Sequence, residues 1–129
     1  MKQNNHGHTP TKLVDPQNPI QRNVYVLCVV MRAFYHLRNE MDSLVVEFRV
    51  TKGRYKDFML KAEFSQTYKS RRRLSYLCNS IGIYDELQSP DQLVGRQVKI
   101  RLVLLGCNYK GKQYSGYRIA GFYPVRSWY

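Results

Sequence analysis

The chain has 129 residues, of which 43% are hydrophobic, so it can bury one core and is too apolar to be wholly disordered. Its longest apolar run, Val24 to Met31, is far shorter than the ~20 residues of a membrane span, and the N-terminus lacks the apolar stretch of a signal peptide. The net charge of +12 indicates a polyanionic partner, and the 11 tyrosines favour nucleic acid over an acidic membrane because their rings can stack on bases.

The three cysteines show no pairing pattern. Cys28, Cys78 and Cys107 are odd in number and widely spaced, which argues against both a disulfide framework and a zinc motif. Cys28 and Cys78 fall in apolar patterns, where cysteine behaves as a small hydrophobic residue. We therefore expect a reducing, cytoplasmic environment.

The first part of the chain has no hydrophobic periodicity. Residues 1–21 are rich in proline and polar side chains, which predicts a flexible or extended N-terminal arm. Residues 24–30 are β-branched and apolar throughout, which predicts a strand buried on both faces. This strand can continue past a bulge through residues 33–36, and a polar loop is expected over 37–42.

A hairpin follows the first strand. Apolar and polar residues alternate over 44–50, which predicts a strand with one solvated face. Residues 51–54 predict a tight turn, with Gly53 at the position that needs a positive φ. The return strand is expected over residues 55–64, with Phe58 facing the core.

A helix is expected after the hairpin. The spacing of apolar residues between 74 and 81 is that of one buried stripe on an amphipathic helix. Ser65 or Thr67 can cap its start, and Gly82 can end it. A short linker that can contain one further helical turn is expected over residues 85–93.

Two strands complete the chain and define the fold class. They are expected over 98–104 and 113–123, with a basic loop at 106–112 between them. Three strands, a helix and two strands is the element order of the OB-fold. The sequence therefore predicts an all-β domain with one helix: a five-stranded OB-fold barrel over residues 22–125, with an α-helix between strands 3 and 4 and a short C-terminal tail at 126–129.

Two other folds compete with this prediction. An SH3-like barrel does not need a helix of this length after its third strand. An open α+β sheet would leave the apolar strand at residues 24–30 without a cover. Both considerations favour the OB barrel.

No catalytic or metal-binding motif is recognisable in the sequence. His36, the single histidine of the expected domain, is more typical of a solvated residue than of a general base. Glu47 and Asp57 can face each other across the hairpin, but the flanking basic residues favour cross-strand ion pairs over a two-metal nuclease site. We therefore expect a non-enzymatic protein without a cofactor or a metal.

Basic and aromatic residues occur where an OB-fold binds oligonucleotides, on strands 2 and 3 and on the loop between the last two strands. Cations in the first half of the helix oppose its dipole, so they are better explained as guides for a polyanion than as helix stabilisers. The alternatives are a merely solvated basic face and, for residues 71–73, an exposed helix end. The candidate nucleic-acid-binding residues are Arg49, Lys52, Arg54, Tyr55, Lys56, Lys61, Arg71, Arg72, Arg73, Tyr109, Lys110, Lys112, Tyr114, Tyr117 and Arg118.

Three short motifs support a family resemblance. They are Leu93-Val94-Gly95-Arg96, Tyr109-Lys110-Gly111-Lys112-Gln113-Tyr114 and Phe122-Tyr123-Pro124. With them, residues 23–124 resemble the small OB-fold single-stranded-DNA-binding proteins of phages and other mobile elements. The resemblance implies binding of single-stranded DNA during replication or recombination, without catalysis and with replication or recombination proteins of the same element as candidate partners.

The C-terminus departs from that pattern, and other functions stay open. Many single-strand-binding proteins end in an acidic tail, whereas residues 124–129 are basic and aromatic, which argues against recruitment of partners through a tail. An RNA-binding barrel is the first alternative, because charge and stacking do not distinguish RNA from DNA without contacts to the 2′-hydroxyl. A protein-interaction subunit and a nuclease are the others.

Overall fold

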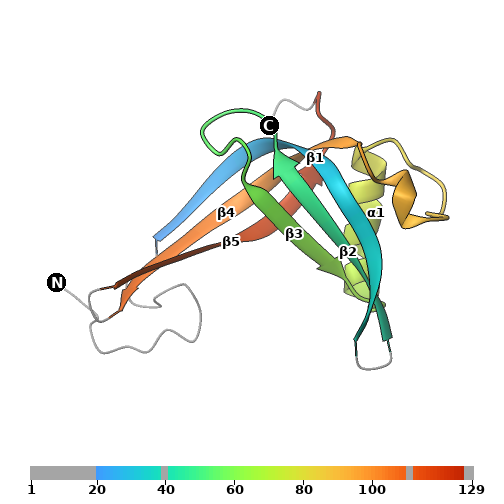
Figure 1. The fold of residues 1–129 in the computed structure, drawn as a ribbon, viewed down its shortest axis with the longest axis horizontal. Coiled ribbons are helices and arrows are strands. Elements are labelled where there is room, and N and C mark those ends of the chain that lie inside the picture. The colour runs from blue at the N-terminus through green and yellow to red at the C-terminus, as the bar shows by residue number, and fades with distance from the viewer. Residues whose placement is uncertain (1–19, 39–40, 110–111, 127–129) are drawn as a thin grey trace. The chain divides into compact units, whose positions relative to one another are not determined.

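The computed structural model describes residues 20–38, 41–109 and 112–126. The elements in chain order are β1 (Ile20–Arg38), β2 (Met41–Val50), β3 (Met59–Phe64), α1 (Tyr68–Ser80), the 3-10 helix η1 (Pro90–Gln92), β4 (Gln97–Tyr109) and β5 (Lys112–Tyr123) (Figure 1). The described part of the chain is thus mostly β, as the sequence predicts, and its one α-helix lies between β3 and β4 in chain order. The expected N-terminal arm lies outside the described residues, except for its last two positions.

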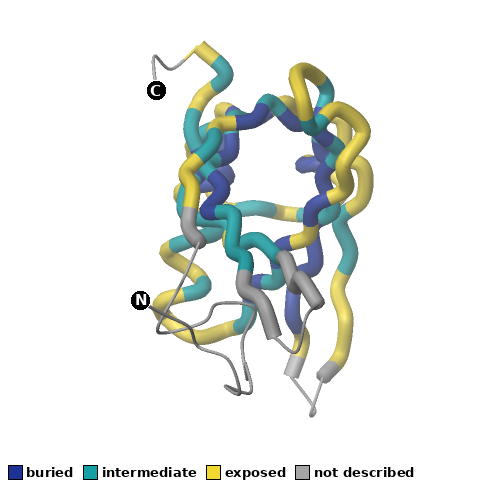
Figure 2. The backbone as a smooth tube through the Cα atoms, turned by 90° about the vertical axis from the view of Figure 1, so that its left-hand side faces the viewer, coloured by how far each residue is buried: buried dark blue, intermediate teal, exposed yellow. Residues whose placement is uncertain are grey.

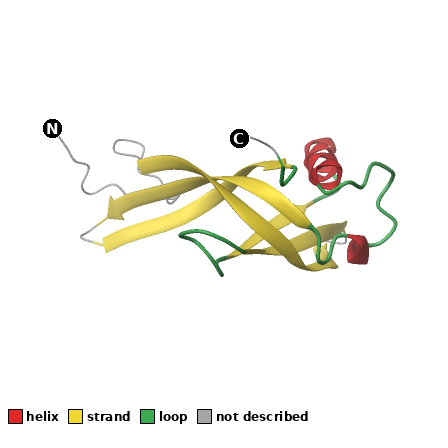
Figure 3. Cartoon of the chain, turned by 90° about the horizontal axis from the view of Figure 1, so that it is seen from above, coloured by secondary structure: helices red, strands yellow, loops and turns green. Residues whose placement is uncertain are grey.

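The chain divides into two compact units. One consists of residues 1–24 and 101–120, and the other consists of residues 25–100 and 121–129. The latter, called the main unit below, contains β2, β3 and both helices. Figure 3 shows α1 and η1 beside the strands of this unit.

All five strands belong to one sheet, in the order β3-β2-β1-β4-β5. Strand β2 is antiparallel to both of its neighbours, β1 and β3. The register of β1 on β2 shifts between Val30 and Arg32, which confirms the expected bulge ahead of residues 33–36. A bulge of this kind bends the strand and increases its twist.

Strand β2 supplies the centre of the core in the main unit. Its side chains Val46, Phe48 and Val50 are fully buried and share one face, as the alternation of the sequence predicts. Phe48 pairs in register with Leu60 of β3, which is also buried. Figure 2 shows the buried stretches of the backbone in dark blue.

Aromatic rings bring the two edge strands of the sheet together. The ring centre of Phe122 in β5 lies 6.1 Å from that of Phe64 in β3 and 6.1 Å from that of Phe48 in β2. Because β2, β1 and β4 stand between β3 and β5 in the sheet, this contact requires the sheet to curl within the main unit. All three rings are buried.

Helix α1 confirms the expected caps and buried stripe. The hydroxyl of Thr67 accepts a hydrogen bond from the backbone N–H of Ser70 at 3.2 Å and caps the helix start. Leu77 and Cys78 are the buried residues of the helix. Gly82 follows the helix with φ +89°, a conformation that L-residues rarely adopt.

Three boundaries expected from the sequence are wrong. Strand β3 begins at Met59 rather than at residue 55, and Phe58, which was expected in the core, is 55% exposed. The expected loop at 37–42 is largely strand, because pairing between β1 and β2 continues through Leu37 and Asp42. Likewise β4 runs to Tyr109, so this residue lies in a strand instead of the expected loop.

Candidate nucleic-acid interface

Residues 51–58, called the β2–β3 loop below, form an ordered loop rather than a simple hairpin turn. The N–H of Lys56 donates to the carbonyl of Gly53 at 3.2 Å, which closes a first turn. The N–H of Asp57 donates to the carbonyl of Val50 at 2.8 Å, which closes the loop onto the end of β2. Gly53 with φ +85° and Asp57 with φ +72° allow the chain to reverse twice.

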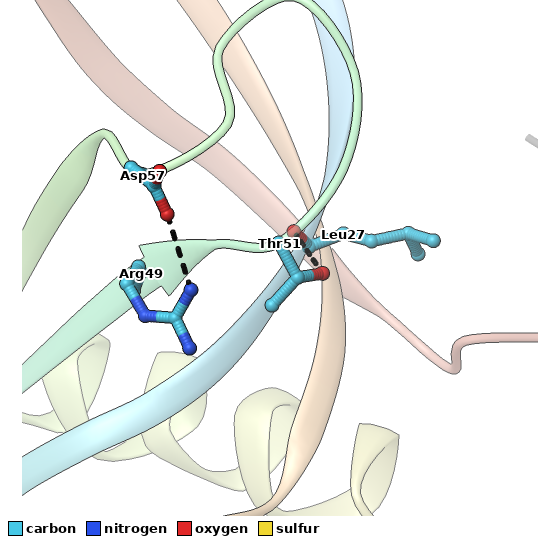
Figure 4. Close-up of polar contacts among 4 residues, drawn as sticks. All are labelled: Leu27, Arg49, Thr51 and Asp57. Atoms are coloured by element: carbon cyan, nitrogen blue, oxygen red, sulfur yellow. Dashed lines mark hydrogen bonds and ion pairs between the residues drawn. The ribbon is translucent and has the colours of Figure 1, made fainter.

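Two further contacts fix the loop to the sheet (Figure 4). The backbone N–H and the hydroxyl of Thr51 both donate to the carbonyl of Leu27 in β1, at 2.8 and 3.2 Å. An ion pair of 3.3 Å joins Arg49 of β2 to Asp57 at the other end of the loop. A loop held in this way presents its side chains from a fixed backbone, which lowers the entropic cost of binding a ligand.

The loop exposes an aromatic surface, made of Tyr55, Phe58 and the adjoining Met59. The ring of Tyr55 stands edge-on to that of Phe58, with ring centres 6.3 Å apart and planes at 68°. Phe58 and Met59 are both exposed although they are large and apolar. Tyr55 is half-buried, so the exposed ring is that of Phe58. An exposed ring on a fixed backbone is the kind of surface on which an unpaired base stacks.

Three cations belong to the same loop as this aromatic surface. Lys52, Arg54 and Lys56 are all exposed, and they alternate along the loop with Gly53 and Tyr55. The guanidinium of Arg54 lies 5.8 Å from the ring centre of Tyr55. Four of the predicted site residues, at 52, 54, 55 and 56, are therefore brought together in one short segment.

The outer face of β1, β2 and β3 is less basic than the sequence suggests. Glu47 lies in register with both Arg32 and Lys61, and its carboxylate forms an ion pair with Arg32 at 3.4 Å. Arg49 is paired with Asp57. Glu47 and Asp57 thus have separate cationic partners, in accord with the expected ion pairs.

Aromatic and basic groups also meet on β1. The guanidinium of Arg32 lies 4.6 Å from the ring centre of Phe34, two residues further along the strand. Phe34 pairs in register with Val45 of β2, whose side chain is buried although it belongs to the outer face. The outer face therefore carries a cation and a ring on β1. Lys61, the predicted site residue on β3, lies on the other side of β2, in register with Glu47.

The three arginines at the start of α1 point to different surroundings. Arg73 covers the core, with its guanidinium 5.3 Å from the ring centre of Phe64 and 6.0 Å from that of Phe122. Arg71 lines a pocket beside α1 that also contains the acidic side chain of Asp85. Arg72 lies over exposed tyrosines on the outside of the helix. The run is thus not a single basic patch.

The remaining predicted site residues belong to β4 and β5 or to the segment between them. Tyr117 is half-buried and Arg118 is exposed, and both belong to the unit that contains residues 101–120. The side chains of Tyr109, Lys112 and Tyr114 lie outside the described residues, as does Lys110 altogether.

The described part of the chain contains no arrangement of three or more His, Cys, Asp or Glu side chains that could hold a metal ion. His36 is exposed. Burial raises the pKa of Cys28 to about 12 and also raises the pKa of Cys78, so neither thiol forms a thiolate near neutral pH. Among the described residues, no helix is both long and apolar enough to cross a membrane.

Sequence reasoning missed several exposed aromatic and basic residues. Phe58 was assigned to the core because alternation was extended backward from β3 into the loop. Arg32 lies directly after the bulge, where the alternation changes phase, so its outward position depends on the bulge. Tyr68 and Tyr76 share a face with Arg72 at intervals of four residues, a spacing that was available in the sequence.

No protein-family model matches the chain, and no match was found among curated proteins.

Proposed function

We propose that this protein is a non-catalytic protein that binds single-stranded DNA with little sequence dependence. The observation that carries the proposal is the β2–β3 loop, which carries the exposed ring of Phe58, the half-buried ring of Tyr55 and three exposed cations on a backbone fixed to the sheet. Rings of this kind stack on any base, and lysine and arginine neutralise phosphates on either side. The net charge of +12 supports a polyanionic ligand.

The proposed fold is an OB barrel. Two observations support it: β3 and β5 are the edges of the sheet, and they approach each other where Phe64 meets Phe122. An OB barrel binds oligonucleotides on strands 2 and 3 and on flanking loops, so the β2–β3 loop and the outer face beside it fall in a suitable place. The resemblance to single-strand-binding proteins of phages and mobile elements implies a role in replication or recombination of such an element. The cysteine pattern favours a reducing, cytoplasmic environment, and the proposed binding needs no cofactor.

The test is a titration of labelled oligonucleotides followed by fluorescence anisotropy. Phe58→Ala should weaken the binding of single-stranded DNA by about 1–3 kcal/mol, the contribution of one stacked base. It should leave the stability of the protein nearly unchanged, because Phe58 is 55% exposed. Tyr84→Ala is the matched control, since Tyr84 is an exposed ring beside acidic rather than basic residues.

Salt dependence separates stacking from charge. Each phosphate contact contributes about −0.7 to the slope of log affinity against log salt on a single strand. Lys52→Ala and Lys56→Ala should each make the slope shallower by about that amount, whereas Phe58→Ala should leave the slope unchanged. A wild-type slope near zero, or equal affinities for Phe58→Ala and Tyr84→Ala, would overturn the proposal.

The same titration compares ligands. Single strands should bind at least about tenfold more tightly than a duplex of equal length, because paired bases cannot stack on the loop. RNA of the same sequence is the third ligand. If RNA binds more tightly than DNA, the ligand of the protein is RNA rather than DNA.

A further inference from the structure

Helix α1 carries a second group of exposed rings and cations. Tyr68 is 70% exposed and Tyr76 is 53% exposed. The guanidinium of Arg72 lies between them, 5.9 Å from each ring centre, and its Nη2 donates a hydrogen bond to the Tyr76 hydroxyl at 3.0 Å. Because residues four apart share a helix face, the three side chains form one continuous ladder, called the α1 ladder below.

The charge of α1 is unfavourable for the helix itself. Lysine and arginine occupy residues 69 and 71–73, and the helix contains no acidic residue. Cations in the first half of a helix oppose its dipole, and here no carboxylate on α1 offsets them. An anionic ligand on this face would remove that repulsion.

The charge of α1 favours a nucleic acid over a protein as its ligand. Tyrosine and arginine are also enriched at protein interfaces, but the centres of such interfaces are depleted of charged residues, whereas α1 carries Lys69 and three arginines without an acidic residue. Flat rings with a guanidinium between them match unpaired bases and phosphates. Tyr84 is the contrasting case, since it is 79% exposed but is followed by Asp85 and Glu86.

We propose that the α1 ladder is a second contact site for single-stranded nucleic acid, distinct from the β2–β3 loop. This inference rests on the proposed function. The two sites lie at opposite ends of β3 (Figure 1). The six residues of β3 span about 20 Å, so an oligonucleotide of about 3 nucleotides, roughly 10 Å long at the stacked spacing of about 3.4 Å, occupies one site, whereas a longer strand reaches both.

The experiment compares single-stranded DNA of about 3 nucleotides, which is too short to reach from one site to the other, with single-stranded DNA of about 25 nucleotides. The longer strand exceeds the ~4–16 nucleotides that one OB-fold covers. Replacing both Tyr68 and Tyr76 by alanine should weaken binding of the long strand at least fivefold, roughly the effect of losing one stacked base. Binding of the short strand should change less than twofold, because the loop is intact. Tyr84→Ala should bind both lengths as the wild type does.

Two further variants separate stacking from structure. Tyr68→Phe with Tyr76→Phe keeps both rings and should retain the long-strand affinity. The melting temperature of every variant is measured beside its affinity, and it should stay close to that of the wild type because the rings are exposed.

The outcomes distinguish failure of this inference from failure of the proposed function. If Phe58→Ala weakens binding of both lengths while the double alanine variant binds both normally, the ladder is not a nucleic-acid site and the proposed function stands. If the wild type binds neither length of DNA, the proposed function is wrong, and the inference that rests on it is wrong as well. If the double variant binds DNA normally but loses binding of a poly-glutamate peptide that the wild type binds, the ladder is a protein-docking surface and the inference is overturned.

Discussion

The ring contact between Phe64 and Phe122 joins the two edge strands, β3 and β5, and a double-mutant cycle can test it. Phe64→Leu and Phe122→Leu each keep an apolar side chain in a buried site, so each should cost about 1.5 kcal/mol or less. A pair of aromatic rings in contact contributes about 0.5–1.5 kcal/mol beyond the area it buries. The double variant should therefore be more stable than the sum of the two single effects predicts, by about that amount.

The assay is equilibrium unfolding in urea, followed by far-UV circular dichroism, with the slope of the free energy against urea compared between variants. Arg73 contacts both rings and can contribute to the coupling energy between them. The same cycle in an Arg73→Gln background therefore isolates the coupling energy of the two rings alone. A control cycle pairs Phe122→Leu with Phe58→Leu, because Phe58 is exposed in the loop and should show additive effects.

The result that would refute the reasoning is additivity of Phe64 and Phe122 within about 0.3 kcal/mol, the scatter found for independent sites. The rings would then not touch in solution, and the two edge strands would not meet at this point. The proposed OB barrel would lose its main support.

Two other predictions concern the helix cap and a buried thiol. Thr67→Ala should lower the free energy of unfolding by about 1 kcal/mol because it removes the cap on the Ser70 N–H, whereas Thr67→Ser should be nearly neutral; equal urea midpoints for both variants would contradict this. Because burial raises the pKa of Cys28 from 9.0 to about 12, the unfolded chain loses the thiol proton first, so stability should fall between those two pH values by about 1.4 kcal/mol per pH unit. In urea titrations at increasing pH, the free energy of unfolding of Cys28→Ala should fall less steeply than that of the wild type. If the two fall equally steeply, the thiol does not contribute to the pH dependence.

Local patterns in the sequence were enough to predict most of the elements. The alternation over residues 44–50 and the stripe at 74–81 report which face of a strand or helix is buried, because side-chain direction repeats every two or 3.6 residues. Thr67 and Gly82 mark the helix ends through chemistry that involves only neighbouring backbone groups. The element order that suggested the OB-fold follows from these patterns alone.

The boundaries and the site depended on interactions that local patterns do not contain. The start of β3 depends on the double turn that ends at Asp57, a non-glycine residue with positive φ, and that turn is what exposes Phe58. Arg49, a predicted site residue, forms an ion pair with Asp57 that joins β2 to the end of the loop. Both follow from the geometry of the loop.

What the sequence determined by itself was the fold class, the helix with its caps and the excess of positive charge, since each depends on composition or on neighbouring residues. Only the tertiary structure decided which charges are available to a ligand. Arg72 and Arg73 are adjacent in the chain, yet one lies between exposed tyrosines and the other over Phe64 and Phe122. Successive residues on a helix point about 100° apart, so their roles separate once the helix packs against strands that are distant in sequence.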